Sequence, residues 1–470
     1  MKFLSLLTIL LFGLFASSQS LNKNLVAAIE QSIKEEMKYS STPGLSICII
    51  NNSKVVYQHS FGIANTTTNI PVTDSTIFEI ASLTKVFTSI ALQTALQKNG
   101  ISINEPIGTF VKGLAPGISS VTFAQLLSHT SGIIDSWPLK IDCADNVLDY
   151  FAEAGDKGLF EKPGKVFSYS NNGFALAGLA LASINKTSYT KAVEDYILKP
   201  LQMTNSSFNI YDVVYRSFAV GHNIGPNGTA TPTLLSFYKK SQPGGGLFSN
   251  INDLSKLAIT LLNKGVVGNN QIINQQVIDT LFVKRNNVFS VPAAPLNYLT
   301  FPNGTYGYGT IHFPYNSLNF VGHPGEAVSQ NAFLFMEPHK KFAVIMLSNR
   351  GFYLFMNSFK KIVEVALGVK ESEPVPFIAK NKNYQPFVGK YIVPDLNREG
   401  KQWSEIFERD GNLFMKTEDN KTVELKQIGN AEFSFKDSSF LFPSAIAFYK
   451  DDQGKYKYLN YLFRTRMRVE

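Results

Sequence analysis

Apolar and polar residues follow strand-like and helical patterns at both ends of the first 370 positions. Residues 22–37 predict an amphipathic helix, because apolar side chains recur at every fourth position. Residues 45–50 and 54–59 predict two strands around the polar turn at 51–53. Residues 83–96 are apolar on most faces of a helix, which is typical of a buried helix.

Strand patterns return shortly before residue 370. Three further strands are predicted at residues 317–321, 330–336 and 342–347, followed by a helix at 352–367. Between the two sets, segment 104–274 mixes short helical patterns with loops rich in Gly, Pro and Asn, and its residues 174–182 predict a tightly packed helix. Strands at both ends of a helical middle predict an α+β fold with one sheet built from both ends of the sequence.

The composition changes after residue 370. Segment 371–383 is polar and contains Pro374 and Pro376, which is typical of a linker. Beyond it, short alternating runs lie between turn signals such as Asp410-Gly411. These runs predict a small C-terminal antiparallel β-barrel or sandwich.

The first residues have the pattern of a signal peptide rather than of a folded element. Lys2 supplies a positive start, residues 3–15 are mostly apolar, and residues 16–18 are small enough for cleavage. The apolar run is shorter than the about 20 residues of a membrane helix, so we expect a secreted, periplasmic or extracellular protein with no membrane span after cleavage. An uncleaved anchor is the alternative. The expected parts are a signal peptide at 1–18, a main domain at 19–370, a linker at 371–383 and a barrel domain at 384–470.

Composition and charge exclude other classes of protein. A chain of 470 residues, 44% of them hydrophobic and 17% charged, is long enough for two folded units and too apolar for disorder. The net charge is +8, but Lys and Arg are scattered, so the sequence predicts no nucleic-acid partner. Arg464, Arg466 and Arg468 alternate along a predicted strand, and we interpret them as solvated surface.

Cysteine and histidine usage adds little chemistry. Cys48 lies in a strand-like run as a small buried hydrophobe, and a disulfide to Cys143 stays open. The six histidines include no pair at ligand spacing and no His-Glu-x-x-His, so the sequence predicts no metal site and no cofactor. Glycosylation sequons, which matter only in a eukaryotic source, begin at Asn51, Asn65, Asn185, Asn205, Asn227, Asn303 and Asn420.

The first candidate for catalysis is Ser82-Leu83-Thr84-Lys85. If a helix starts here, Ser82 and Lys85 are one turn apart on one face, so the amine reaches the hydroxyl. A serine needs a base to become a nucleophile, and a lysine serves as a base only if burial or a nearby cation lowers its pKa. The spacing alone is weak, because Ser-x-x-Lys also begins at Ser20, Ser183, Ser188, Ser236 and Ser358.

Two further motifs carry polar chemistry. Tyr169-Ser170-Asn171 precedes the predicted small-residue helix. Tyr169 is a candidate proton shuttle, and Asn171 is a candidate donor to a substrate carbonyl. The structural alternative is a turn in which Asn171 or Asn172 caps the helix. His323-Pro324-Gly325-Glu326 leads into an apolar strand, and His323 could equally be a turn histidine.

In this order, the three motifs resemble those of the β-lactamase-related serine hydrolases, which include class C β-lactamases, D-alanyl-D-alanine carboxypeptidases, D-aminopeptidases, family VIII esterases and LACTB-like proteases. Residues 82–85 match Ser-x-x-Lys, residues 169–171 match Tyr-x-Asn, and residues 323–325 stand at the position of Lys-Thr-Gly or His-x-Gly. Stretches 126–133 and 243–249 also resemble the family, and we interpret both as structural, with His129 as a satisfied internal histidine.

The resemblance implies a β-lactamase/transpeptidase-like antiparallel sheet flanked by helices, with an all-helical region and the active site at the junction. It implies that Ser82 attacks an ester or amide carbonyl, Lys85 accepts its proton, and Tyr169 protonates the leaving group and later activates water. The backbone N–H groups of Ser82 and Glu326 would hold the oxyanion, at about 2.7 to 4 kcal/mol per donor. The implied substrate-binding residues are Asn171, His323, Gly325 and Glu326.

The resemblance leaves the substrate open. His323 replaces the lysine usual in efficient β-lactamases and Glu326 places a carboxylate nearby, so we expect poor or no β-lactamase activity. The segment opening at 385–391 resembles the lipocalin-like barrel of some D-aminopeptidase and esterase relatives. We expect a small-molecule or peptide substrate. The sequence leaves open the choice between esterase and peptidase activity, the stereochemistry of the substrate and the oligomeric state. The alternative function is an inactive binding or scaffold protein.

Overall fold

The computed structural model describes residues 21–135, 147–233, 242–289, 301, 303–371, 377–378, 383–395, 400–436 and 444–469. The expected signal segment, Cys143 and most of the expected linker lie outside these ranges, so the predictions about them stay predictions. Cys48 is buried and free. Among the described residues, no helix combines the length and apolar content needed to cross a membrane.

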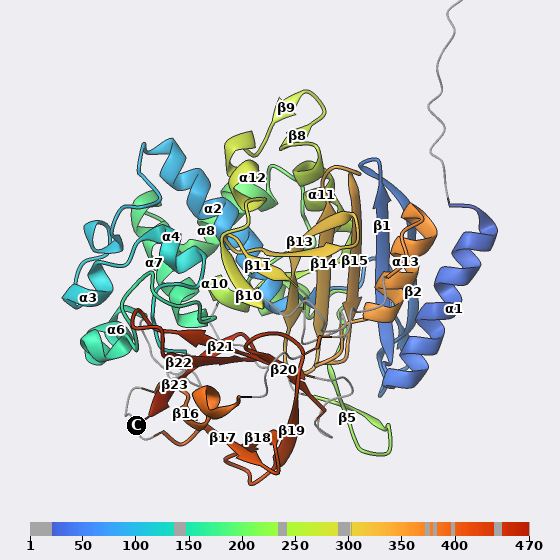
Figure 1. Cartoon of the computed structure of the whole chain (residues 1–470). Coiled ribbons are helices and arrows are strands. Elements are labelled where there is room, and N and C mark those ends of the chain that lie inside the picture. The colour runs from blue at the N-terminus through green and yellow to red at the C-terminus, as the bar shows by residue number, and fades with distance from the viewer. Residues whose placement is uncertain are drawn as a thin grey trace, which may run out of the picture.

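A nine-stranded antiparallel sheet forms the centre of the main domain (Figure 1), in the order β10-β11-β12-β13-β14-β15-β1-β2-β3. Its strands are β1 (Gly44–Asn51), β2 (Lys54–Asn65), β3 (Ile70–Pro71), β10 (Asn286–Phe289), β11 (Gly304–Tyr306), β12 (Ile311–Tyr315), β13 (Leu318–Glu326), β14 (Asn331–Glu337) and β15 (Phe342–Ser348). Strand β1 pairs with β15, with Cys48 opposite Ile345. One sheet therefore joins both ends of the main domain, and the predicted fold class is confirmed.

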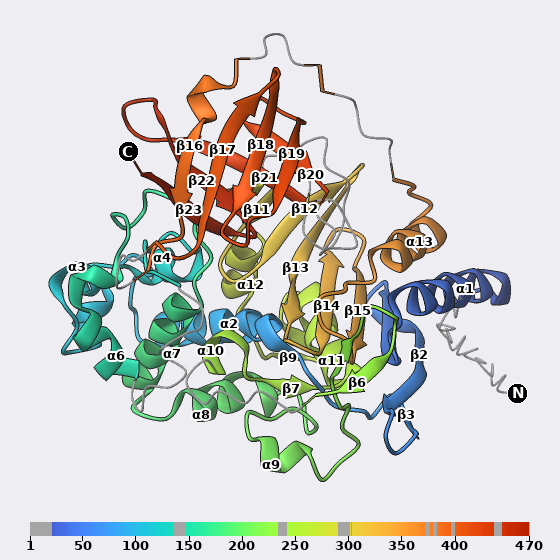
Figure 2. The ribbon, with the colours of Figure 1, turned by 90° about the horizontal axis from the view of Figure 1, so that it is seen from below.

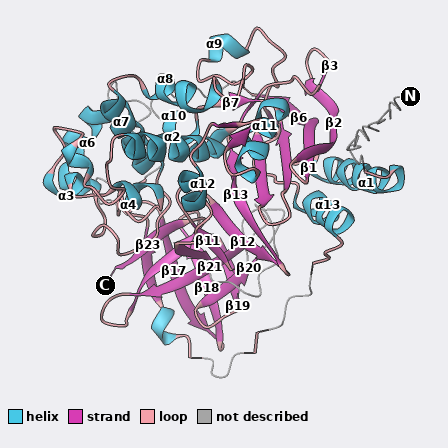
Figure 3. Cartoon of the chain, turned by 90° about the horizontal axis from the view of Figure 1, so that it is seen from above, coloured by secondary structure: helices cyan, strands magenta, loops and turns pink. Residues whose placement is uncertain are grey.

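Helices cover both faces of this sheet (Figure 3). They are α1 (Lys23–Ser40), α2 (Thr84–Lys98), α3 (Pro116–Ser119), α4 (Phe123–Leu127), α6 (Val147–Ala154), α7 (Asn171–Asn185), α8 (Tyr189–Val193), α9 (Ile210–Val213), α10 (Gln242–Gly245), α11 (Ile251–Leu262), α12 (Gln275–Leu281) and α13 (Met356–Leu367). Ile29 of α1 and Phe359 of α13 belong to the same apolar core as Ile47. Leu92 of α2 belongs to a second core, which includes Cys48 on the opposite face of β1.

The C-terminal residues form a closed eight-stranded antiparallel barrel beside the main domain (Figure 2). Its strands are β16 (Gly389–Ile392), β17 (Trp403–Arg409), β18 (Asn412–Thr417), β19 (Thr422–Gln427), β20 (Glu432–Phe435), β21 (Ser444–Lys450), β22 (Tyr456–Tyr461) and β23 (Arg464–Val469). The barrel closes where Tyr391 of β16 pairs with Arg468 of β23. Aromatic side chains such as Phe433 and Phe448 fill its interior, so the predicted barrel is confirmed.

The third motif lies inside a strand, not in a turn before one. Strand β13 continues to Glu326, which pairs with Asn331 of β14, whereas β12 pairs with β13 only as far as Gly322. Beyond Gly322, β13 therefore has no β12 neighbour on that side. Pro324 is tolerated there because proline lacks an N–H donor and is confined to strand positions that need none. The turn interpretation of His323 is wrong for this reason.

Candidate active site

Ser82 lies in a 3₁₀ turn, Ala81–Leu83, that leads directly into α2. Ala81 has a φ of 43°, and a non-glycine residue in this region stores strain, of order 1 to 3 kcal/mol. Strand β13 packs closely against this segment, because a Cβ on Gly325 would come within 1.9 Å of the Ile80 carbonyl oxygen. Gly325 therefore allows β13 to approach the backbone that carries Ser82.

Lys85 is completely buried and points its amine at three acceptors. Its Nζ lies 3.2 Å from Ser82 Oγ, 2.7 Å from Asn171 Oδ1 and 2.6 Å from the Gly244 carbonyl oxygen. Burial lowers the pKa of Lys85 well below its ordinary value. The predicted same-face geometry is therefore present. Stretch 243–249, which the sequence analysis interpreted as structural, instead contributes Gly244 to the site.

Tyr169 lies next to both Ser82 and Lys85. Its side chain is hydrogen-bonded to Ser82, and burial raises its pKa above the ordinary value for tyrosine. The Lys85 amine lies 4.7 Å from the centre of the tyrosine ring. Tyr169 is therefore a neutral phenol in this state, which suits a proton donor.

Asn171 is the first residue of α7, and its side chain is free to face Lys85 because another residue caps the helix. The cap is Ser170, whose hydroxyl accepts from the Gly173 N–H at 3.0 Å. The backbone N–H groups of Asn171 and Asn172 donate to Asp135 Oδ1 at 2.8 and 3.2 Å. A helix N-terminus leaves such donors unpaired, and Asp135 satisfies two of them.

His323 is buried beside the site in a chain of neutral hydrogen bonds. Its Nδ1 donates to the Pro324 carbonyl oxygen at 2.5 Å, so Nε2 accepts from the Tyr306 hydroxyl at 3.0 Å. The same hydroxyl accepts from His129 Nε2 at 3.2 Å, and His129 Nδ1 accepts from the Ser170 N–H. Burial, with Lys85 nearby, lowers the pKa of His323 to about 3. His129 is the satisfied internal histidine that the sequence predicts.

Glu326 ends β13 with a half-buried side chain. Burial raises the pKa of its carboxyl to about 8, while Arg464 lowers it. The group is therefore mostly protonated at neutral pH. Glu326 therefore does not repel an anionic β-lactam through a full charge at neutral pH, and the repulsion expected from the sequence is wrong there.

Two charged residues of the site were missed by the sequence analysis. Arg464, at the start of β23, places Nε and Nη2 at 3.1 and 2.8 Å from Asp135 Oδ2. Its guanidinium lies 5.6 Å from the Tyr169 ring centre. The solvated-surface interpretation is wrong for Arg464, because its guanidinium pairs with the buried Asp135. Arg466 and Arg468 are half-buried and hydrogen-bonded, to Ser404 and to the Val388 carbonyl oxygen. No local pattern links positions 135 and 464.

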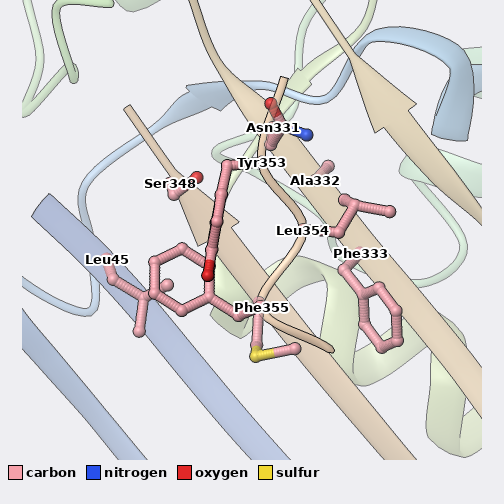
Figure 4. Close-up of a pocket in the computed structure, with 9 residues that line it drawn as sticks. Leu45, Asn331, Ala332, Phe333, Ser348, Tyr353, Leu354 and Phe355 are labelled. Carbon is pink, nitrogen blue, oxygen red and sulfur yellow. The ribbon is translucent and has the colours of Figure 1, made fainter. Parts of the chain in front are cut away.

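A small cavity lies away from this constellation (Figure 4). It is lined by Leu45, Asn331, Ala332, Phe333, Met346, Ser348, Tyr353, Leu354 and Phe355. None of Ser82, Lys85 and Tyr169 belongs to its wall. Among the described residues, no cluster of three or more His, Cys, Asp or Glu side chains converges as metal ligands would.

The family model described as Beta-lactamase matches residues 29–360, which is most of the chain. The chain therefore belongs to the Beta-lactamase family, and the resemblance noted from its motifs is confirmed. Membership supports serine hydrolase activity in general terms.

Individual relatives resemble the chain in sequence or in fold. Protein flp of Staphylococcus aureus (strain NCTC 8325 / PS 47) is 26% identical over 333 residues, which cover 68% of this chain and 62% of that protein. The chain thus spans less than two thirds of that relative. An octameric penicillin-binding protein homologue from Pyrococcus abyssi superimposes with a TM-score of 0.65 at 25% identity, over 94% of this chain and 100% of its own. SurE superimposes with a TM-score of 0.76 at 21% identity, over 95% and 99%.

Proposed function

We propose that the protein is a secreted serine hydrolase that cleaves an ester or amide bond through an acyl-enzyme on Ser82. The observation that carries the proposal is that a fully buried lysine and a partly buried tyrosine both contact Ser82. The Lys85 amine lies 3.2 Å from Ser82 Oγ, and the Tyr169 side chain is hydrogen-bonded to the same group. The Lys85 distance is within the range that proton transfer requires.

In acylation, Ser82 Oγ attacks the carbonyl carbon while Lys85 takes the hydroxyl proton. Burial supports this role, since it lowers the pKa of Lys85 and so increases the neutral fraction that can act as a base. The backbone N–H groups of Ser82 and Glu326 are proposed to hold the oxyanion. Tyr169 then gives its proton to the leaving group and recovers one from Lys85, so the bond breaks without releasing a strong base.

Deacylation reverses the proton path. A water molecule takes the place of the leaving group, Tyr169 or Lys85 accepts its proton, and the Ser82 oxygen leaves as the restored hydroxyl. Asn171 is proposed to position the acyl amide while it holds Lys85, and His323 and Gly325 border the substrate.

The charges around Ser82 support a neutral substrate group more than an anion. His323 is neutral, Glu326 is mostly protonated at neutral pH, and Asp135 pairs with the Arg464 cation. None of these groups offers an unpaired positive charge to the carboxylate that a β-lactam carries. This absence supports weak turnover of β-lactams. The scaffold alternative has no specific observation in its favour, because all three motif elements meet at one point.

Hydrolysis of chromogenic substrates tests this proposal. The purified protein should hydrolyse p-nitrophenyl esters or the p-nitroanilides of D- or L-amino acids, and the Ser82→Ala variant should not. A comparison of esters with D- and L-anilides also determines the bond and stereochemistry that the family leaves open. A folded wild-type protein that hydrolyses none of these compounds above the Ser82→Ala background would favour the scaffold alternative.

A further inference from the structure

The barrel supplies a cation to a buried carboxylate of the main domain. Arg464 and Asp135 are separated by 329 positions, and their side chains meet at 2.8 Å. The Asp135 side chain is only 2% exposed, whereas that of Arg464 is 36% exposed. A buried carboxylate is costly unless it is paired and hydrogen-bonded, so Asp135 depends on the partner that the barrel provides.

Asp135 transmits this contact to the helix that carries Asn171. One carboxylate oxygen accepts from the backbone N–H groups of Asn171 and Asn172, and the other accepts from Arg464. The carboxylate therefore links the barrel to the first turn of α7. Asn171 Oδ1 in turn lies 2.7 Å from Lys85 Nζ, so the link ends at the amine beside Ser82.

The residues next to Arg464 hold the segment before α7 as well. The Tyr169 N–H donates to the Phe463 carbonyl oxygen at 2.9 Å, and the Thr465 hydroxyl donates to the Phe167 carbonyl oxygen at 2.7 Å. The turn between β22 and β23 that makes these contacts is strained, since Phe463 has a φ of 65°. The barrel therefore holds the backbone from Phe167 to the N–H of Tyr169, directly before the Tyr169 side chain.

We propose that Arg464 is a positioning residue of the hydrolase, which acts by holding Asp135 against the first turn of α7 and thereby fixing Asn171 beside Lys85. This inference rests on the proposed function of Ser82 and goes beyond it, because it makes the main-domain site dependent on the barrel. Arg464 acts through other residues, so its loss should lower kcat and leave KM nearly unchanged.

Electrostatics give this role a measurable signature. The charged and titratable groups around the Lys85 amine are Asp135, Tyr169, His129, His323 and Arg464. Burial is the main cause of the low pKa of Lys85; Asp135 opposes it and Arg464 reinforces it. Loss of Arg464 should therefore raise the pKa of Lys85 and move the acid limb of the kcat/KM profile to higher pH. Loss of the Asp135 charge should move that limb to lower pH.

The test is a pH profile of ester hydrolysis for matched variants. We expect Arg464→Gln to lower kcat by about 10- to 100-fold, the size of effect that a small misplacement of catalytic groups produces, and to shift the acid limb upward. Asp135→Asn should shift it downward, and the double variant should lie between them. Arg464→Lys keeps the charge but not the paired donors. The acid limb of its kcat/KM profile should therefore stay near that of the wild type while kcat falls. This variant also serves as the test if Arg464→Gln does not fold.

The matched control is Lys457→Gln, which breaks another ion pair between the barrel and the main domain. Lys457 Nζ lies 3.0 Å from Glu161 Oε2, and its loss should move neither kcat nor the acid limb. A folded Arg464→Gln variant with wild-type kcat and an unmoved limb would overturn the inference, as would equal losses in Arg464→Gln and Lys457→Gln. A wild-type protein that hydrolyses neither esters nor anilides above the Ser82→Ala background would instead contradict the hydrolase function itself.

Discussion

Lys85 Nζ lies closer to Asn171 Oδ1, at 2.7 Å, than to Ser82 Oγ, at 3.2 Å. The base of the proposed reaction is therefore held by the helix of the second motif as well as by its own. The charge of the residue at position 171 should control the protonation of Lys85, because an amide oxygen contributes only a dipole where a carboxylate would contribute a full charge.

Asn171→Asp should raise the pKa of Lys85, because a carboxylate beside the amine favours its charged form. Less of the amine is then neutral at pH 7, so kcat/KM should fall, about tenfold for a rise of one unit, and the acid limb of its pH profile should move upward. Asn171→Ala removes the contact without adding charge and is the control; a limb that moves equally in both variants would contradict this account. The measurement is a pH profile of ester hydrolysis.

Gly325→Ala should damage both stability and activity. The new Cβ would lie 1.9 Å from the Ile80 carbonyl oxygen, so β13 or the segment before Ser82 must move. Overpacking of this kind typically costs about 1 to 3 kcal/mol, measured as a lower free energy of unfolding in urea. Gly225→Ala is the control, since its nearest neighbour would be 3.2 Å away. Wild-type stability and activity in Gly325→Ala would show that the close approach does not matter.

The spacing of Ser82 and Lys85 and the helix that follows them could be predicted from the sequence, because one turn of α-helix is a local rule. The chemistry of the two remaining motifs could be proposed from their own residues, whereas their placement in one site with Ser82 came from the family resemblance. The pairing of Arg464 with Asp135 could not be predicted, since it depends on how the barrel docks and no periodic pattern records that. The position of His323 within β13 was missed for a related reason. Pro324 indicates the end of a strand unless it is known that the neighbouring strand β12 pairs with β13 only as far as Gly322.

Glu326→Gln should change the dependence of stability on pH. Burial raises the pKa of Glu326 to about 8 in the folded state, so folding favours the protonated acid, and the stability it contributes is present at low pH and lost as the pH rises from its ordinary value towards 8. Glutamine imitates the protonated form. The variant should therefore gain stability relative to the wild type between pH 5 and pH 9, measured by urea unfolding.

Glu364→Gln provides the opposite control for that measurement. Hydrogen bonds from Lys361 and Lys370 lower the pKa of Glu364, so its removal should bring no gain in stability at pH 9. If Glu326→Gln shows the same difference from the wild type at both pH values, the carboxyl does not carry the proposed proton.

Nitrocefin turnover should be slow or absent at pH 7. His323 stands where efficient β-lactamases have a lysine and is neutral, with a pKa lowered to about 3, so it offers no positive charge to the β-lactam carboxylate. Wild-type turnover at about 10 to 1000 per second, typical of good enzymes, would contradict this reading of the site.

Covalent labelling with a fluorophosphonate probe tests the central claim most directly, because it detects an activated serine without knowledge of the substrate. We expect the probe phosphorus to bond to Ser82 Oγ with loss of fluoride, as mapped by peptide mass spectrometry. Ser358 shares the Ser-x-x-Lys spacing but is buried and hydrogen-bonded to Glu36, so it should stay unlabelled. Ser82→Ala should abolish labelling, Lys85→Ala should nearly do so, and Tyr169→Phe should slow it by about 100- to 10,000-fold. Labelling that persists in Ser82→Ala, or a folded wild-type protein that never labels, would contradict the account.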